Sequence, residues 1–235
     1  MAAEIVTISF FEYKGFTNKW WAFKQMQIAY DSLAGTKGMK FHKMLGSGGK
    51  RGFSIFPNFG VYGFLSVWEK EQNATDFFST HPSHQAFLEH AKQHWTIYLK
   101  TNKVHGSWEG ASPFQTTISA QKNTLIGVLT RATIYTKHLI HFWKFVPPVS
   151  ASVHDKKGLL FSIGIGELPL VQQATFSLWE SSELMMAYAY KSRYHREVVQ
   201  KTRELGWYKE ELFARFHPYK TVGSWQGIPD LQTYF

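Results

Sequence analysis

Ser177-Leu178-Trp179-Glu180 opens a passage that continues through a helical segment and closes with Gly223-Ser224-Trp225-Gln226-Gly227. The same series occurs once before, opened by Ser66-Val67-Trp68-Glu69 and closed by Gly106-Ser107-Trp108-Glu109-Gly110. The second copy follows the first by 111 residues at the opening tryptophan and by 117 at the closing glycine. Such self-similarity indicates an internal repeat, and two copies are too few for a solenoid. The chain is therefore expected to be a tandem duplication of one α+β unit.

Both copies have the same order of expected elements. Period-2 alternation predicts strands, helical spacing of apolar residues predicts helices, and the order strand–helix–strand–strand–helix–strand is ferredoxin-like. Because helices would cover one face of each sheet, we expect the bare faces to pair in a two-repeat α/β barrel or sandwich. A homodimer is also compatible with this fold. The first copy has expected strands at 5–11, 39–45, 60–68 and up to 108, with helices at 18–33 and 75–95; the second has strands at 125–134, 158–166, 174–179 and 212–219, with helices at 138–145 and 183–205.

The polar stretch 111–123 contains Pro113 and is the expected linker, so the repeats are placed at 1–110 and 124–235. Two further loop signals lie in the first repeat. The glycine-rich stretch 46–52 is expected to be a flexible loop, and Pro57-Asn58 is expected to be a turn. The glycine spacing of this loop matches neither a Walker nor a dinucleotide fingerprint.

Composition narrows the function classes. The 235 residues include no cysteine, which excludes disulfides, thiolate nucleophiles and thiolate-ligated haem or zinc. The net charge of +9 is dispersed, which argues against a nucleic-acid arm and leaves a weak attraction to anionic surfaces such as membrane headgroups. Without a long apolar run or a signal-peptide pattern, the protein is expected in the cytoplasm, with peripheral contact to a membrane left open.

Several motifs in one order resemble the spheroidene monooxygenase family, the carotenoid oxygenases that introduce a keto group into acyclic carotenoids. The resemblance spans about 5–225 and is looser in the first half, where it rests on the Gly-Ser-Gly of 46–48, Phe53, Pro57-Asn58 and Val61-Tyr62. In the second half the motifs are Leu129-Thr130-Arg131-Ala132-Thr133-Ile134, Phe142-Trp143, Val146-Pro147, Val149-Ser150, Ile163-Gly164-Ile165-Gly166-Glu167, Thr175-Phe176-Ser177-Leu178-Trp179, Gly206-Trp207-Tyr208 and Glu211-Leu212-Phe213-Ala214-Arg215-Phe216.

The resemblance implies a monooxygenase that contains haem b, uses O₂ and acts on an apolar, carotenoid-like small molecule. Electrons would come from an external donor, because the sequence has no flavin or nicotinamide motif. Three alternatives stay open. A haem barrel could catalyse dehydration or rearrangement at a nitrogen–oxygen bond, the chain could be a non-enzymatic haem or lipid carrier, or the barrel could oxidise its substrate without a cofactor.

His195 is the candidate axial ligand of the haem iron. It lies near the start of the second-repeat helix, and Val198, Val199 and Thr202 share its face, so it should point toward the sheet. Haem proteins of similar barrel fold likewise take this ligand from the second repeat. The alternative is a surface histidine beside Arg196. His84 is its repeat counterpart and the second candidate.

Arg131 is the candidate catalytic and haem-contacting cation. Alternation places it with Leu129 and Thr133 on one face of an apolar strand, where a guanidinium needs an anion. A haem propionate or an oxygen species would serve, and the alternative is an ion pair with Glu167 or Glu180. The further expected propionate contacts are Lys191, Arg193 and Arg215, each of which could equally be a solvated charge.

Aromatic residues of the second repeat could together line a long apolar pocket, although each alone is more typical of a core. Trp143 and Phe176 are the two expected to contact the cofactor. The set comprises Trp143, Phe145, Phe161, Phe176, Trp179, Trp207 and Phe213.

Overall fold

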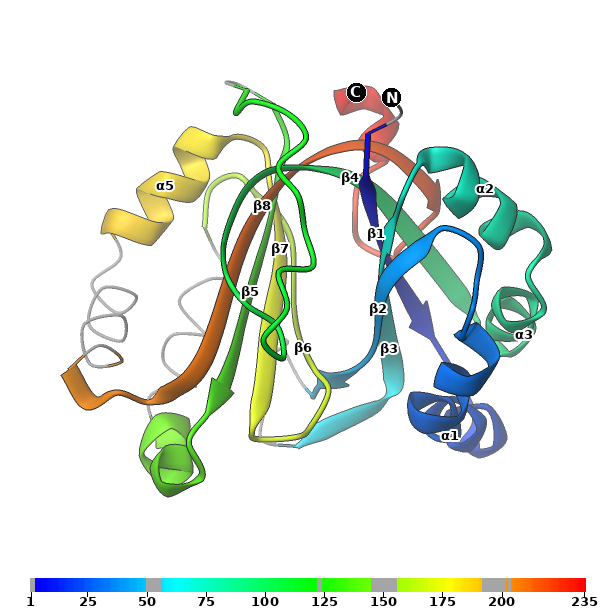
Figure 1. Ribbon diagram of the computed structural model, residues 1–235, viewed down its shortest axis with the longest axis horizontal. Coiled ribbons are helices and arrows are strands. Elements are labelled where there is room, and N and C mark those ends of the chain that lie inside the picture. The colour runs from blue at the N-terminus through cyan, green and yellow to red at the C-terminus, as the bar shows by residue number, and fades with distance from the viewer. Residues whose placement is uncertain (1–2, 50–55, 122–123, 145–155, 192–201, 203) are drawn as a thin grey trace.

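The computed structural model contains one closed antiparallel barrel of eight strands in the order β1-β3-β2-β6-β7-β5-β8-β4 (Figure 1). It describes residues 3–49, 56–121, 124–144, 156–191, 202 and 204–235. Within each repeat the fourth strand pairs with the first, the first with the third, and the third with the second. This is the ferredoxin-like order, so the expected two-repeat barrel is confirmed.

The first repeat places three helices on the outside of its four strands (Figure 1). The α1 helix buries Ala22, Ala29 and Leu33, which recur at helical spacing and pack toward the sheet. Its elements are β1 Ile5–Glu12, α1 Phe16–Leu33, β2 Met39–Gly48, β3 Pro57–Trp68, α2 Glu71–Thr80, α3 Pro82–His90 and β4 Gln93–Gly106.

The second repeat follows the same order. Its first strand leads into a 3₁₀ turn, and residues 139–144 continue as α-helix. Residues 202, 204 and 205 are also helical, as expected for the end of the second helix. Its elements are β5 Ile126–Ile134, η1 Thr136–His138, β6 Leu159–Gly166, β7 Gln172–Trp179, α5 Ser182–Lys191, β8 Tyr208–Gly223 and η2 Leu231–Tyr234.

Two seams join the repeats. The long seam pairs β4 with β8 from Trp95↔Gly223 to Gly106↔Leu212. The short seam pairs β2 with β6 only at Gly46↔Gly166 and Ser47↔Ile165. The loop expected at 46–52 is therefore wrong over its first three residues, because barrel closure takes them into β2. The turn expected at Pro57-Asn58 is also wrong, since these residues pair with Gly48 and Ser47.

The helix expected to carry Phe87, Ala91 and Trp95 on one face ends earlier than predicted. α3 ends at His90, and the backbone of Ala91 is already extended. Trp95 belongs to β4 and packs inside the barrel against Phe10, 6.5 Å between ring centroids. The helical spacing of these residues was therefore coincidental beyond His90.

The barrel interior is a packed core, and the second-repeat aromatics are divided among three clusters rather than one pocket. Phe161 and Phe176 point into the barrel, Trp179 and Phe213 pack on its outside near α5, and Trp143 and Trp207 pack near 139–144. The expectation of one aromatic-lined pocket is wrong for these residues, because alternate strand residues face opposite sides of the sheet. Phe145 lies outside the described residues.

The stretch 111–121 of the expected linker lies against the barrel. Phe114 is buried and packs edge-on against Phe216 of β8, with ring centroids 5.3 Å apart. The Thr101 carbonyl accepts from the backbone N–H of Thr117 at 2.9 Å. This connection is therefore held to β4 and β8, and the repeat boundaries themselves stay a prediction.

Candidate functional site

The outer face of the second repeat is less covered than that of the first. Equivalent positions follow from the strand register, because Ile5↔Trp68 in the first repeat matches Ile126↔Trp179 in the second. Thr130 points outward from β5 and is exposed, although β5 is flanked by strands on both sides. Its counterpart Ser9 is fully buried. The second repeat thus leaves uncovered the position that the first repeat seals.

Smaller and more polar side chains account for part of this difference. Phe11 is replaced by Ala132, Phe64 by Thr175 and Tyr62 by Gln173 at equivalent register positions. In the first repeat these three aromatic rings are buried beneath the helices. In the second, Thr175 and Gln173 are half-buried. We refer to Thr130, Ala132, Gln173 and Thr175 as the second-repeat outer face.

Two apolar clusters flank the second-repeat outer face. On one side α5 packs through Met185 and Tyr188 on Trp179, and the Tyr188 and Trp179 rings stack at 5.3 Å. On the other side Phe142 of the 139–144 helix packs edge-on against Trp207 at 5.8 Å. Figure 1 shows these two helical segments at opposite ends of the sheet formed by β5, β7 and β8. The uncovered position therefore lies between them.

Arg215 lies beside this face on β8 and is the predicted propionate contact whose environment is best described. Its register partner on β5 is Val128, two residues from Thr130. The Arg215 guanidinium lies over the Phe213 ring at 5.2 Å. Within the described part of the chain, its buried Nε has no hydrogen-bond partner and its guanidinium forms no ion pair. A buried unpaired N–H donor favours binding of an anion there.

The remaining predicted haem contacts are only partly described. His195 and Arg193 lie outside the described residues, and Lys191 ends α5 with its side chain also outside them. Trp143 lies on the 139–144 helix, where its Nε1 donates to the Leu170 carbonyl at 3.0 Å. Phe176 points into the barrel, on the opposite side of β7 from Thr175. A direct contact between Phe176 and a group on the outer face is therefore not compatible with this arrangement.

His84 is buried within the sealed outer face of the first repeat. Its ring packs against Phe11 at 6.3 Å and Phe78 at 4.9 Å. Burial lowers the pKa of His84 to about 4, and the nearby backbone of Phe78 offsets part of this shift. Among the described residues, neither ring nitrogen has a partner in ordinary hydrogen-bond geometry. The neutral imidazole could ligate a metal, but these rings leave no space for a porphyrin. Across the described residues, no three His, Asp or Glu side chains are grouped to hold a metal ion.

A cleft of about 390 Å³ lies beside Trp225 and differs from the second-repeat outer face in chemistry. Trp95, Gly223 and residues 228–232 contribute to its lining. The lining contains no histidine, lysine or arginine, and Asp230 is its charged residue. Without an imidazole or a cation, this cleft does not suit a haem with its carboxylates.

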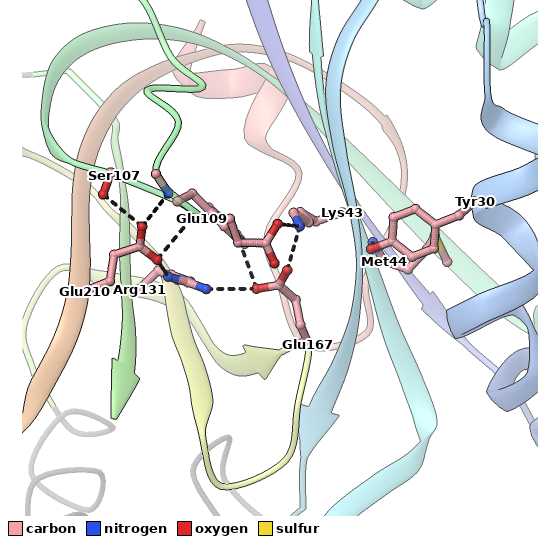
Figure 2. A network of polar contacts seen from close by, with 10 residues as sticks. Tyr30, Lys43, Met44, Ser107, Glu109, Arg131, Glu167 and Glu210 are labelled. Atoms are coloured by element: carbon pink, nitrogen blue, oxygen red, sulfur yellow. Dashed lines mark hydrogen bonds and ion pairs between the residues drawn. The ribbon is translucent and has the colours of Figure 1, made fainter. Parts of the chain in front are cut away.

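Arg131 points into the barrel and belongs to a network of charges that joins the two repeats (Figure 2). Its guanidinium pairs with Glu210 and, at 3.4 Å, with Glu167. Lys43 of β2 pairs with the same Glu167 at 2.9 Å and with Glu109 at 2.6 Å. An ion pair with Glu167 is one of the alternatives expected for Arg131, and the structure contains it. Glu180, the other carboxylate named, is not among the ion-pair partners of Arg131 in the described part of the chain. Because two carboxylates already hold the guanidinium, contact with a bound ligand stays a prediction.

Glu210 organises the closing motif of the first repeat. It accepts hydrogen bonds from the backbone N–H groups of Gly110 at 2.7 Å and Glu109 at 3.0 Å, and from Ser107 Oγ at 2.8 Å. Burial opposes the charge, but these donors and Arg131 outweigh it and lower the pKa of Glu210 to about 2. Glu210 is thus ionised at neutral pH and fixes the turn that carries Trp108.

The first repeat contains an uncharged version of the same arrangement. Gln93 occupies the position of Glu210, and its Oε1 accepts from the backbone N–H of Gln226 at 3.1 Å. Phe10 occupies the position of Arg131 and packs edge-on against Trp225 at 6.2 Å, where Arg131 lies 5.3 Å over Trp108. Sequence reasoning missed Glu210, although its spacing of 117 residues from Gln93 matches the offset of the closing motifs.

The chain is similar in sequence to proteins with established names. A spheroidene monooxygenase of Rhodobacter capsulatus is 33% identical over 225 residues, which are 95% of this chain and 93% of the relative. The chain belongs to the spheroidene monooxygenase family. A second member, from Cereibacter sphaeroides, is 34% identical over 95% of this chain and 69% of its own length. Membership makes the chain an oxidoreductase of the monooxygenase class and confirms the resemblance that the motifs indicated. No protein-family model matches the chain.

Solved structures support the fold independently. An aldoxime dehydratase superposes with a TM-score of 0.61 at 10% identity, covering 94% of this chain and 83% of that structure. A second aldoxime dehydratase, in complex with butyraldoxime, gives a TM-score of 0.60 at 7% identity over 95% and 84% of the two chains. At such identities the likeness concerns the two-repeat barrel alone.

Proposed function

We propose that the chain is a haem-dependent monooxygenase of an apolar, carotenoid-like small molecule, and that haem b binds on the second-repeat outer face. The observation that carries the proposal is the exposure of Thr130 at a position where its counterpart Ser9 is sealed. A duplicated fold that keeps one face packed and opens the other has one face suited to a ligand. The relatives named spheroidene monooxygenase supply the substrate class.

The repeat also supports His195 as the axial ligand. His84 packs against Phe11 across the outer face of the first repeat, at 6.3 Å between ring centroids. The counterpart of Phe11 is Ala132, and His195 follows His84 by the same 111 residues as Trp179 follows Trp68. The repeat would therefore set His195 opposite Ala132, where the smaller side chain leaves space for a porphyrin. A neutral imidazole is the form that ligates iron.

Arg215 is the proposed propionate contact, because its buried Nε has no hydrogen-bond partner among the described residues and a planar guanidinium matches a carboxylate. Lys191 and Arg193 are proposed as further cations near the same carboxylates. Trp143 would contribute to the apolar wall at the 139–144 end. Arg131 lies on the barrel side of β5, so we assign it the ion pair with Glu210 rather than a contact with the reacting atoms.

When bound, haem would supply the activation of O₂. One oxygen atom would enter a C–H bond of the substrate and the other would leave as water, with two electrons and two protons taken from an external donor. The chain would bind the polyene through apolar side chains such as Phe213 and Trp143, which exclude water from the reacting carbon. Thr130 and Gln173 would offer hydrogen bonds to polar groups on this face.

The ratio of O₂ and electrons consumed to product formed tests the proposal. Purified protein, reconstituted with hemin and given a reductase system and an acyclic carotenoid, should consume one O₂ and two electrons for each oxygen atom found in product. Labelled O₂ should deliver its label to the product. Conversion of an aldoxime without consumption of O₂ or net reductant would instead support the nitrogen–oxygen chemistry of the structurally similar dehydratases.

A further inference from the structure

The α1 helix exposes an aromatic stripe. Phe16 is 85% exposed, Trp20 53% and Phe23 45%, and their spacing of four and three residues places them on one face of the helix. Phe59 at the start of β3 extends the stripe, because its ring lies 5.8 Å from Phe23, which stacks on Trp20 at 5.7 Å. These four residues form what we call the α1 aromatic patch.

This patch is not a by-product of core packing. The opposite face of α1 already supplies the buried residues Ala22, Ala29 and Leu33. Single exposed apolar residues are common on soluble proteins, but contiguous aromatic rings in ring-to-ring contact mark a surface that another body covers.

The charges of residues 13–30, the stretch that carries three of the four patch residues, are of one sign. Residues 13–30 include Lys14, Lys19 and Lys24 and no Asp or Glu. All three lysines are exposed and none forms an ion pair within the described part of the chain. The covering body should therefore offer negative charge beside an apolar layer.

The second repeat places similar side chains at the same end of the molecule. The register brings the ends of β1, β2, β5 and β6 together, and Figure 1 shows α1, the start of β3, the β6–β7 connection and the helical turn after β5 at the lower end of the view. The exposed apolar residues of this second group are Tyr135, Ile140, Leu168 and Leu170. Lys137 lies 5.6 Å over the Tyr135 ring. Both repeats thus contribute to one docking end.

We propose that this end docks peripherally on an anionic lipid bilayer, with the α1 aromatic patch at headgroup depth and the lysines against lipid phosphates. Exposed Trp and Phe beside Lys suit the membrane interface, where rings meet the acyl boundary and ammonium groups meet the headgroups. No helix among the described residues is long and apolar enough to cross a bilayer. A symmetric dimer through the patch would bring like-charged lysines together. The proposal does not depend on haem or on the substrate.

Vesicle flotation of the full chain tests the proposal. Protein should float with phosphatidylcholine vesicles containing 30% phosphatidylglycerol and stay in the dense fraction with pure phosphatidylcholine, and binding should weaken as salt rises. Phe23→Ser should reduce the partition coefficient roughly tenfold, since a ring leaves the interface. Phe235→Ser is the matched control, because Phe235 is also 45% exposed but lies at the C-terminus, at the opposite end of Figure 1.

Substitutions of single lysines separate the electrostatic contribution to vesicle binding from the contribution of the aromatic rings. Lys19→Gln and Lys24→Gln should each lower binding to anionic vesicles roughly fivefold. Lys103→Gln, an exposed lysine of β4, should change it less than twofold. Equal flotation of Phe23→Ser and Phe235→Ser would overturn the proposal. It would also be overturned if wild-type protein bound neither vesicle and Phe23→Ser only converted a dimer to a monomer, since the patch would then join two copies.

Discussion

Glu210→Gln should remove the charge that Glu210 contributes to the Arg131 network. The variant keeps the shape of the side chain, and its amide oxygen can still accept from Gly110 and Ser107, whereas its amide nitrogen replaces the Oε2 that accepts from Glu109 and Arg131. A carboxyl whose pKa falls from 4.5 to about 2 is stabilised in its charged form by roughly 3 kcal/mol. The Glu210 side chain is 18% exposed and water screens part of this, so we expect a loss of about 1–3 kcal/mol at pH 7.

The direction of the pKa shift of Glu210 determines how the stabilisation depends on pH. Because the folded pKa lies below the ordinary value, the stabilisation is complete above about pH 5 and disappears as the pH falls from 4.5 through about 2. Thermal unfolding followed by circular dichroism should show the Glu210→Gln midpoint about 2–8 °C below wild type at pH 7, and this difference should fall to about half or less at pH 3. An equal difference at both pH values, or none at pH 7, would refute the reasoning.

Substitution of Arg131 tests the same ion pair from the side of the cation. Arg131→Phe alone leaves Glu210 without its cation and Glu167 with Lys43 only, and should cost about 3–5 kcal/mol. Arg131→Phe combined with Glu210→Gln recreates the Phe10 and Gln93 arrangement of the first repeat and should recover part of that loss. Additive losses in the double variant would show that the two side chains do not interact.

Three further outcomes follow from single sites. Gly106→Ala should destabilise the protein by about 2 kcal/mol or more in chemical denaturation, since its φ is +86° and a Cβ would overlap the Glu211 carbonyl. The control Gly227→Ala, with φ +83° and no neighbour within 4 Å, should cost only about 1 kcal/mol. His84→Leu should remove the loss of stability that wild type shows as the pH falls from 6.5 toward 4, because buried His84 resists protonation; an unchanged slope would contradict this. Ala132→Phe, which restores the aromatic ring of the first repeat, should leave the melting temperature within a few degrees of wild type while abolishing the hemin-induced Soret band; retained binding would move the cofactor elsewhere.

Much of the fold could be predicted because the repeat is visible in the sequence. The tryptophans that open each copy fix the strand register, and apolar periodicity separates α1 from the strands around it. What the sequence did not reveal depends on distant partners. Gly46 and Ser47 are strand residues only because β6 pairs with them, and Trp95 leaves the helical pattern because β4 begins there.

The candidate site was predictable only in part. Alternation correctly placed Arg131 on the same face of β5 as Leu129, which the structure shows to be the barrel side, and the apolar surroundings required an anion, of which Glu167 was named. Glu210 was missed because it lies 79 residues away and its role depends on the turn that it caps. The uncovered Thr130 could not be foreseen from its own neighbours, since only the comparison of two folded repeats shows that the equivalent Ser9 is sealed. The roles of His195 and Arg215 and the oligomeric state stay predictions.

The most direct test of the central claim is a hemin titration followed at the Soret band. Wild type and His105→Ala, which changes an exposed histidine of β4, should bind one hemin per chain, and the band should shift on reduction with dithionite and again with carbon monoxide. His195→Ala should lose the band and regain it when free imidazole is added. Equal binding by wild type and His195→Ala would contradict the assigned ligand, and no Soret band in wild type would contradict the haem site itself.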